Sequence, residues 1–468
     1  MSLTKSIAAW AAGVKWQDVP ARVQEHAKDD LRDVLSVMFA GALTTSAQIA
    51  AQYARASPGP VPLAAGGTAA PPAAAFANGV AAAALDLEDG HYRGGAIHPA
   101  SVVCAAVLAS APPGASVAGV LTAQIAGFEV CLRAAATLWP RYPGDWYHCT
   151  GCTGAIGAAV AAAYLRGLDA DAMFRAIVIA WQHAPMSTFA LPMVKESIGW
   201  GAQTGTSAAL LAESGYMQLP DGYDPPMPNV MPGTPFDREG ADQDSFVTSY
   251  GTVWEAGATY FKQFAACRYI HAAASGLHAM ASEHKLTSEN IASIEVGTHR
   301  GAVFLAEPQP RTLEHAQYSF PHVLAAIVID GRAGAAEISE SHLDDPERAA
   351  LASRVTVTHD ESMDREYPAR YGSRLRVTRT DGRVLEGRFL DAPGDAACPL
   401  TQMELQDKWR STLALVVPDD VASGLLHGIG DPGRRFADVI GPVFRAMAIP
   451  ATPVHTGADP QHQHSRGD

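Results

Sequence analysis

Apolar residues recur at helical spacing through most of the first half of the chain. Between Ala21 and Leu43 they return every three or four residues, which predicts an amphipathic helix. A second helix is expected over 47–56, because SPGPVP at 57–62 breaks the pattern. Six further helices are predicted, at 72–85, 99–111, 115–138, 152–166, 170–183 and 199–214. Because alternating β-branched segments are almost missing here, we expect this half to be all-helical.

The pattern changes after a proline-rich stretch at 220–235. Residues 293–299 and 353–359 are rich in β-branched residues and are predicted to be strands. Two alternating runs within 373–390 surround Asp381-Gly382, which indicates a β-hairpin. Helical spacing is found on both sides of these strands, at 268–284 and 317–330, and it returns from Pro399 to about Ile449.

These patterns predict a mainly α fold with a large all-helical domain and a smaller α+β lid domain. The helical domain is expected to span residues 1–262 and to be completed by 400–450, while the lid spans 263–399. Residues 451–468 are polar and are expected to be disordered.

Composition excludes several classes of partner. The formal net charge is −14, so phosphate backbones and anionic lipid surfaces would be repelled, and neither nucleic acid nor membrane is expected as a partner. Six cysteines in 468 residues are too few for a disulfide framework and favour a cytoplasmic location. MSLTKSIAAWAAG is interpreted as the first helix rather than as a signal peptide.

One polar segment stands between two predicted buried helices, at residues 84–103. Its ionisable residues include Asp86, His91, Arg93 and His98, and such charges must be paired or must serve a ligand. His98 directly precedes Pro99, so we expect it at the N-terminus of a helix, where an anion is favoured. The alternative is a solvated loop with an aspartate cap.

A second segment, 146–164, is rich in glycine. His148 and Gly151 lie at the entry to an alanine-rich helix, where free backbone N–H groups can bind an anion. Close helix packing explains the glycines equally well. Cys149 and Cys152 form a CxxC, but a second pair of zinc ligands at suitable spacing is missing, so we interpret them as buried thiols.

Three more segments place ionisable groups among apolar residues. Lys195 stands before a Gly/Ala-rich helix, and Lys262 and Arg268 lie within YFKQFAACRYIHAAASGL. Buried lysines are costly unless they are paired, so two of them suggest contacts with substrate carboxylates. His322 leads an apolar helix within EHAQYSFPHVLAAIVIDG.

Taken in this order, six segments resemble the MmgE/PrpD family over about residues 5–450. They are ALDLEDG…HPAS, CTGCTGAIGAAVAAA, K-x-x-x-G-x-G-A-x-x-G from Lys195 to Gly205, FKQFAACRYIHAA, AQYSFPHVLAAIVIDG and DAPGDAACPLTQMELQDKW. Members of this family dehydrate 2-methylcitrate, decarboxylate cis-aconitate or epimerise iminodisuccinate. The resemblance implies a helical domain with an α+β lid, a homodimer, and neither a metal nor a cofactor.

The resemblance also implies roles for particular residues. It places Asp86, His98, His148, Lys195 and Lys262 in the active site. Together with the residue patterns, this gives as catalytic candidates His98, His148, Asp86, Lys262 and His322, and as substrate-binding candidates Lys195, His91, Arg93, Gly151 and Arg268. His322 falls where the decarboxylases of the family carry a tyrosine, which counts against decarboxylation. The stretch between Asp86 and His98 is longer than in the family, which can change specificity.

We therefore expect a cofactor-independent hydro-lyase that acts on a small polycarboxylate by removing a proton next to a carboxylate. Lys195 and Lys262 would hold carboxylates, Asp86 would orient a histidine, and His98 and His148 would exchange protons with the substrate. An epimerase of an imino- or amino-dicarboxylate and a decarboxylase of the cis-aconitate type are enzymatic alternatives. A polycarboxylate-binding protein without turnover is the non-enzymatic alternative.

Overall fold

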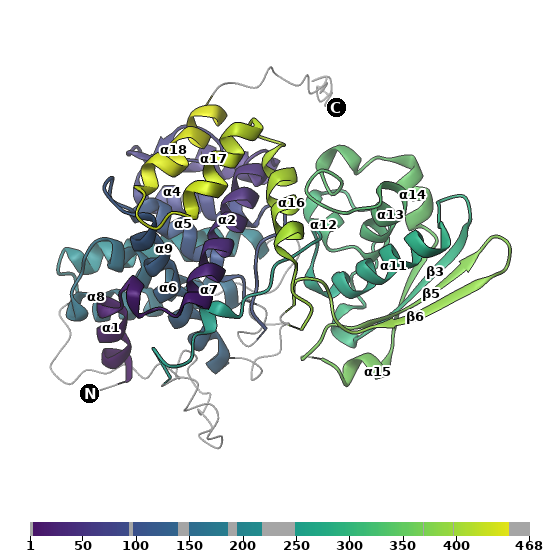
Figure 1. Ribbon diagram of the computed structural model, residues 1–468, viewed down its shortest axis with the longest axis horizontal. Helices are drawn as coiled ribbons and strands as arrows, with labels where there is room; N and C mark the ends of the chain where they lie inside the picture. Colours follow the sequence, from purple (N-terminus) through teal and green to yellow (C-terminus); the bar gives the residue numbers. More distant parts are fainter. Residues whose placement is uncertain are drawn as a thin grey trace, which may run out of the picture.

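The computed structural model describes residues 3–92, 97–138, 149–185, 194–217, 249–367, 369–395 and 397–448. They form a large helical domain and a smaller α+β domain, which lie side by side in Figure 1. The predicted fold class is therefore confirmed. The expected tail at 451–468 lies outside the described residues.

Among the described residues, nine helices of the helical domain come from the first half of the chain. They are α1 (Leu3–Gly13), α2 (Ala21–Gly41), α3 (Thr45–Ala54), α4 (Pro71–Ala83), α5 (Pro99–Ser110), α6 (Val117–Leu138), α7 (Cys149–Leu165), α8 (Ala170–Gln182) and α9 (Val194–Glu213). A two-residue pairing of β1 (Val61–Pro62) with β2 (Thr68–Ala69) joins α3 to α4. The predicted helices are confirmed, with α7 and α9 starting three and five residues earlier than expected.

Small residues allow the central helices to approach closely. A Cβ atom on Gly151 of α7 would collide with the Ser197 carbonyl of α9, and one on Gly201 of α9 would collide with the Gly151 carbonyl. Gly127 of α6 and Gly157 of α7 meet in the same way. The glycines of the 146–164 segment therefore serve the packing of α6, α7 and α9.

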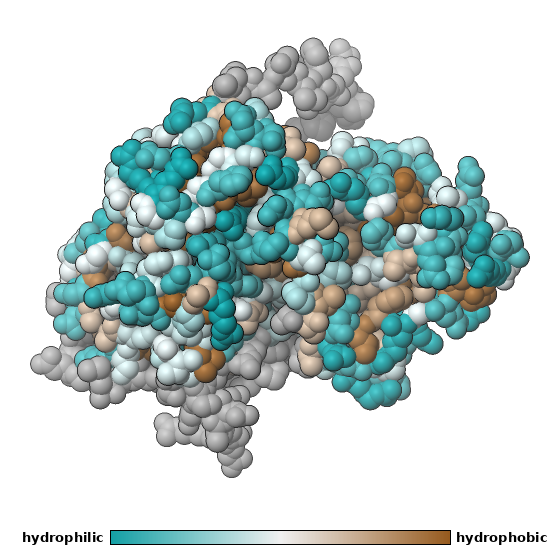
Figure 2. All heavy atoms as spheres, viewed as in Figure 1, coloured by the Kyte–Doolittle hydropathy of each residue, from teal (hydrophilic) through white to brown (hydrophobic). Residues whose placement is uncertain are grey.

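Helix α6 lies at the centre of this packing. By length and composition its segment Val117–Ala136 could cross a membrane, but 89% of its apolar window is buried inside the protein. This burial is typical of a core helix. On the outside, Figure 2 shows polar side chains over most of the visible face of both domains, with hydrophobic residues in small separate patches.

The α+β domain is built on a four-stranded sheet. Its strands are β3 (Ile291–Thr298), β4 (Val355–His359), β5 (Ser373–Arg379) and β6 (Val384–Phe389). The order is β4-β3-β5-β6, with β3 and β4 parallel and the other neighbours antiparallel. Leu375 and Val377 of β5 are buried while Arg374 and Arg376 are not, so one face of the sheet is apolar, as the alternation in the sequence predicts.

The α+β domain also contains helices. They are α11 (His271–His284), α12 (Leu313–Gln317), α13 (Phe320–Asp330), α14 (Pro346–Ala352) and α15 (Glu361–Asp364), with the short 3-10 helices η3 (Arg268–Ile270), η4 (Arg300–Ala302) and η5 (Glu340–His342). Helix α14 was not predicted. Its signal is Asp345-Pro346, in which the aspartate caps the helix and proline occupies the first turn.

The chain then returns to the helical domain through α16 (Gln402–Leu413), α17 (Asp419–Ile429) and α18 (Phe436–Met447). Figure 1 shows α16 in the middle of the molecule, beside both domains. The contact with α2 is ionic: Lys408 Nζ lies 2.7 Å from Asp33 Oδ1, and the Trp409 indole donates to the same oxygen over 2.9 Å. Lys408 also donates to the Leu87 carbonyl over 2.9 Å.

We predict that Lys408→Ala lowers the free energy of unfolding by about 3–5 kcal/mol, because it leaves the buried Asp33 carboxylate without its cation. Arg410→Ala is the matched control on the same helix, since its ion pair with Asp419 is exposed and should contribute less than about 1 kcal/mol. Urea unfolding followed by circular dichroism measures both. Equal losses for the two variants would contradict the assignment of Lys408 as a structural anchor.

Candidate functional site

The pair Asp86 and Lys262 is buried between the two domains. Lys262 Nζ lies 2.5 Å from Asp86 Oδ1 and 3.1 Å from the Asp86 carbonyl, and Lys262 is only 1% exposed. Asp86 follows α4 with a φ of 49°, which is uncommon for a residue other than glycine. This local strain turns both the carbonyl and the carboxylate of Asp86 towards one ammonium group.

Lys262 remains charged in these surroundings. Burial by itself would lower its pKa, but the carboxylates of Asp86 and Glu88 outweigh burial and raise the pKa above its usual value. An ammonium group has three N–H donors, and within the described part of the chain Asp86 accepts from two of them. One donor is therefore left for another acceptor.

A second functional side chain is attached to the same loop. His98 is the N-cap residue of α5 and Pro99 is the first residue of that helix, which confirms the prediction from His98-Pro99. Its ring Nδ1 lies 2.5 Å from the Asp89 carbonyl, and its main-chain N–H donates to Thr150 of α7 over 3.2 Å. The hydrogen bond that orients His98 thus comes from the main chain of Asp89, whereas Asp86, from which we expected it, holds Lys262.

Lys262 and His98 are bound to the same short loop. Lys262 is bound to Asp86 and His98 is bound to Asp89, and three residues span no more than about 11 Å even when fully extended. The loop that begins after α4 thus brings a charged amine and an imidazole to the same region between the domains. The sequence-based hypothesis also requires His148 and the side chain of Lys195, which lie outside the described residues, so it stays a prediction.

His91 lies in the same loop but is turned into the protein. It is buried, and its Nε2 lies 3.3 Å from the Glu255 carboxylate of η2 (Glu255–Gly257). Its Nδ1 has no hydrogen-bond partner among the described residues. Glu255 was missed by the sequence reasoning, because an isolated acid in a loop gives no signal of its partner.

Arg268 holds the domain junction together. Its five N–H donors are distributed over Tyr92 Oη, His271 Nδ1, Asp395 Oδ1 and the carbonyls of Ala392 and Pro393. Its guanidinium also lies over the Tyr260 ring, 4.5 Å from the centroid. Every donor of Arg268 is already used, so a substrate would have to displace one of these partners.

Tyr92 connects the long stretch before His98 to this junction. Its hydroxyl donates to Asp395 Oδ1 over 2.7 Å and accepts from Arg268 Nε over 3.0 Å. Asp395 lies in DAPGDAACPL, 303 residues further along the chain. The sequence gives no indication of this contact, because it depends on the return of the chain from the α+β domain.

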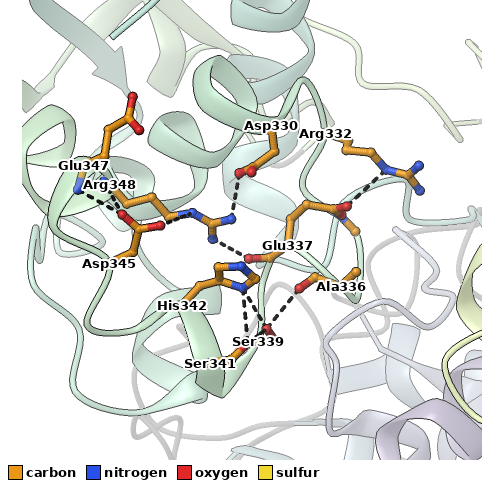
Figure 3. Close-up of polar contacts among 11 residues, drawn as sticks. Asp330, Arg332, Ala336, Glu337, Ser339, Ser341, His342, Asp345, Glu347 and Arg348 are labelled. Carbon is orange, nitrogen blue, oxygen red and sulfur yellow. Dashed lines mark hydrogen bonds and ion pairs between the residues drawn. The ribbon is translucent and has the colours of Figure 1, made fainter.

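His322 lies within the α+β domain. It is buried at the start of α13, and its Nε2 has no hydrogen-bond partner among the described residues. The charges that act on it belong to Arg348, His342 and Asp345, which Figure 3 shows around the loop between α13 and α14. These three charges belong to the α+β domain, and the role of His322 at the site stays a prediction.

A tyrosine lies near the Asp86–Lys262 pair. Tyr318 is buried, and after burial the carboxylate of Asp86 is the largest cause that raises the pKa of its phenol. It stands four residues before His322 in AQYSFPHV. A tyrosine can thus act at this site although His322 replaces the tyrosine of the family decarboxylases.

The remaining candidates are placed only in part. His148 and Arg93 lie outside the described residues, as does the side chain of Lys195. The main chain of Lys195 lies in the first turn of α9, not before the helix as expected, since no helix breaker stands between Val194 and Gly199. Gly151 lies within α7 and packs against α9, which favours close packing over an anion-binding cradle.

The CxxC does not form a reactive site. Cys149 and Cys152 are buried in α7, and burial raises the pKa of the Cys149 thiol to about 12, so it stays protonated. Within the ranges that the structure describes, no group of three or more His, Cys, Asp and Glu side chains is placed to bind a metal ion.

A cavity of about 500 Å³ opens on the other side of the loop, between α16 and the segment that follows α13. Leu87, Lys408 and residues 331–336 line it, together with Met403 and Asp407 of α16. Leu87 stands next to Asp86, but neither Lys262 nor His98 lines this cavity. We therefore assign the candidate site to the Asp86–Lys262 side of the loop.

Both halves of the chain match one family of known proteins. Residues 5–225 match the MmgE/PrpD N-terminal domain, and residues 264–425 match the MmgE/PrpD C-terminal domain. The chain is 26% identical over 462 residues to a cis-aconitate decarboxylase of Aspergillus terreus, covering 89% of this chain and 90% of that protein. It is 25% identical over 456 residues to the cis-aconitate decarboxylase of Homo sapiens, covering 91% and 90%.

The position of His322 leads to a prediction on acid stability. Burial, with Arg348 and His342, lowers the pKa of His322 to about 4, whereas an unfolded histidine titrates near 6.5. Between these values the unfolded chain binds the additional proton, so stability falls as the pH falls through this window. We expect His322→Gln to remove about 2–3 kcal/mol of the stability loss between pH 7 and pH 4.5.

Urea unfolding at several pH values measures this difference. His427→Gln is the control, because His427 is exposed on α17 and its replacement should leave the acid loss as it is in the parent protein. An unchanged acid loss in His322→Gln would show that this imidazole is not held neutral by burial.

Proposed function

Because the chain belongs to the MmgE/PrpD family, we propose that it is a lyase that acts on a small polycarboxylate without a cofactor. The observation that carries this proposal is the buried, charged Lys262, which Asp86 holds with one N–H donor to spare. A substrate carboxylate suits that donor, because a hydrogen bond between an ammonium group and a carboxylate is stronger than one between neutral groups. The His98 imidazole, attached to the same loop, would move the proton.

Decarboxylation of a cis-aconitate-like acid is the first reaction that we propose. In that reaction the bond between the carbon skeleton and one carboxylate breaks, carbon dioxide leaves, and the remaining electron pair accepts a proton. Lys262 would stabilise the negative charge that develops, and His98 in its protonated form would supply the proton. Two observations support decarboxylation. The similar proteins of Aspergillus terreus and Homo sapiens are cis-aconitate decarboxylases, and the carboxylate of Asp86 acts on the phenol of Tyr318.

Dehydration of a citrate-like hydroxy acid is the second candidate. Here a base removes a proton from carbon and the hydroxyl leaves as water, which requires the same cation and the same imidazole. The replacement of the family tyrosine by His322, as the sequence aligns it, favours this reaction. An epimerase would use a base on each face of the substrate, and the second of these would have to be His148.

A panel of acids distinguishes these reactions. Purified protein is incubated with cis-aconitate, 2-methylcitrate, citrate and iminodisuccinate, and each mixture is followed in three ways. Release of carbon dioxide indicates decarboxylation, a new ultraviolet absorbance without carbon dioxide indicates dehydration, and loss of optical rotation at constant mass indicates epimerisation. Binding of an acid in calorimetry without any turnover would contradict the enzymatic proposal.

We expect His98→Ala to lower kcat by about 10²–10⁴-fold, which is the usual contribution of one general acid or base. The melting temperature should change little, because His98 is partly exposed at a helix terminus. His278→Ala is the control, since His278 is exposed on α11 and lies outside the proposed site. Turnover close to that of the parent protein in folded His98→Ala would remove His98 from the mechanism.

A further inference from the structure

The ring of His98 is held in one tautomer by the main chain. A carbonyl oxygen can only accept, so the contact of 2.5 Å between His98 Nδ1 and the Asp89 carbonyl requires the proton to lie on Nδ1. In the neutral ring the lone pair is then on Nε2. His98 therefore presents Nε2 as its basic atom, and Nε2–H as its acidic group once it is protonated.

The side chain of Asp89 holds the same turn from the other side. Its Oδ1 accepts from the main-chain N–H of Ala100 over 3.1 Å, two residues after His98, and Asp89 is 1% exposed. Asp89 is thus bonded to residue 98 through its carbonyl and to residue 100 through its carboxyl group. Two bonds from one residue fix the distance and the angle between the loop and the first turn of α5.

We infer that Asp89 is the positioning residue for His98, its carbonyl fixing the Nδ1–H tautomer and its carboxyl group fixing the loop against α5. This inference rests on the proposed function for the role of His98, but the placement of the ring can be tested without it. Asp89 does not touch the substrate in this scheme. It acts through His98 alone.

The charges around Asp89 indicate that its carboxyl group works in the neutral form. Asp30 and Asp33 of α2 and Glu88 of the loop face it, and Lys408 of α16 is the cation on that side. Burial raises the pKa of Asp89 well above its usual value, the Ala100 N–H lowers it, and Glu88 and Asp33 raise it again. Its second oxygen, Oδ2, has no hydrogen-bond partner within the described ranges, so no donor stabilises a full negative charge there.

A neutral Asp89 has a consequence for the chemistry of His98. A carboxylate beside an imidazole raises the pKa of the ring and favours imidazolium, whereas a neutral carboxyl group does not. A neutral neighbour therefore does not lock His98 in the imidazolium form, and a group that both accepts and returns a proton must be able to leave that form. Asp89 therefore fixes the position of the His98 ring without placing a negative charge beside it.

Two substitutions test this role of Asp89. Asp89→Asn keeps an oxygen for the Ala100 N–H and removes the ability to ionise, so we expect kcat and KM within about threefold of the parent values. Asp89→Ala removes that contact, and we expect kcat to fall by about 10–100-fold at nearly constant KM, because small displacements of a catalytic group have effects of this size. Val107→Ala is the matched control, since it loosens α5 at a buried position remote from the loop.

A second measurement does not depend on turnover. The rate at which diethyl pyrocarbonate modifies His98, followed by peptide mass spectrometry over a range of pH, reports the pKa and the accessibility of the ring. We expect the same pH dependence in the parent protein, Asp89→Asn and Val107→Ala, and a changed rate in Asp89→Ala. An unchanged rate together with unchanged kcat in folded Asp89→Ala would overturn the positioning role.

The variant Asp89→Asn also tests whether the carboxyl group of Asp89 is neutral. If Asp89 were ionised, Asp89→Asn would lower the pKa of His98 by about one unit and would lower kcat as well. That result would overturn the inference. Absence of turnover in the parent protein with every acid would instead contradict the proposed function, while the labelling of His98 would still decide whether Asp89 holds the ring.

Discussion

Two buried lysines hold the loop after α4, and the rest of the site depends on them. Lys262 donates to the carbonyl and carboxylate of Asp86, and Lys408 donates to the next carbonyl, that of Leu87. Lys262 belongs to the segment that leads into the α+β domain, and Lys408 belongs to α16, which follows that domain. The loop is therefore bound by both segments that connect the two domains, one before and one after the α+β domain.

This arrangement explains why so many acids can be buried together. Asp30, Asp33, Asp86, Glu88 and Asp89 are all less than 5% exposed, and carboxylates at such positions are costly without cations or donors. Lys262 and Lys408 supply the cations, while Thr259 donates to Asp30 and Ala100 donates to Asp89. At Asp30 and Asp89 the cations do not offset burial, and burial raises the pKa of each carboxyl group well above its usual value.

Different cations lie at the domain junction and at the candidate site, Arg268 at the first and Lys262 at the second. Arg268 has all five donors occupied by protein acceptors and joins Tyr92 to Asp395, so it fixes the relative position of the segments around the site. Lys262 keeps one N–H donor without an acceptor among the described residues, and it is the cation that we propose for binding a substrate carboxylate. The planar, five-donor guanidinium suits the structural task and the compact ammonium suits the exchange of ligands.

The sequence by itself determined the fold class and the longer helices and strands, whereas the short elements α12, α14, α15, β1 and β2 were not predicted. Helical spacing and the hairpin around Asp381-Gly382 depend on local periodicity, which is a property of neighbouring residues. His98-Pro99 likewise defined a helix start, because proline excludes the preceding turns whatever packs around it. The candidates Asp86, Lys262 and His98 could be named for the same reason, as ionisable groups in apolar segments that resemble one family.

Only the tertiary structure decided which of these groups meet. Asp86 is bound to Lys262, 176 residues later, and Tyr92 to Asp395, 303 residues later, and no periodicity connects positions so far apart. His322 begins α13 close to the charges of Arg348, His342 and Asp345, and its place at the site stays a prediction. Pairing of buried charges is decided by the low dielectric of the assembled interior, and that interior does not exist until distant segments have come together.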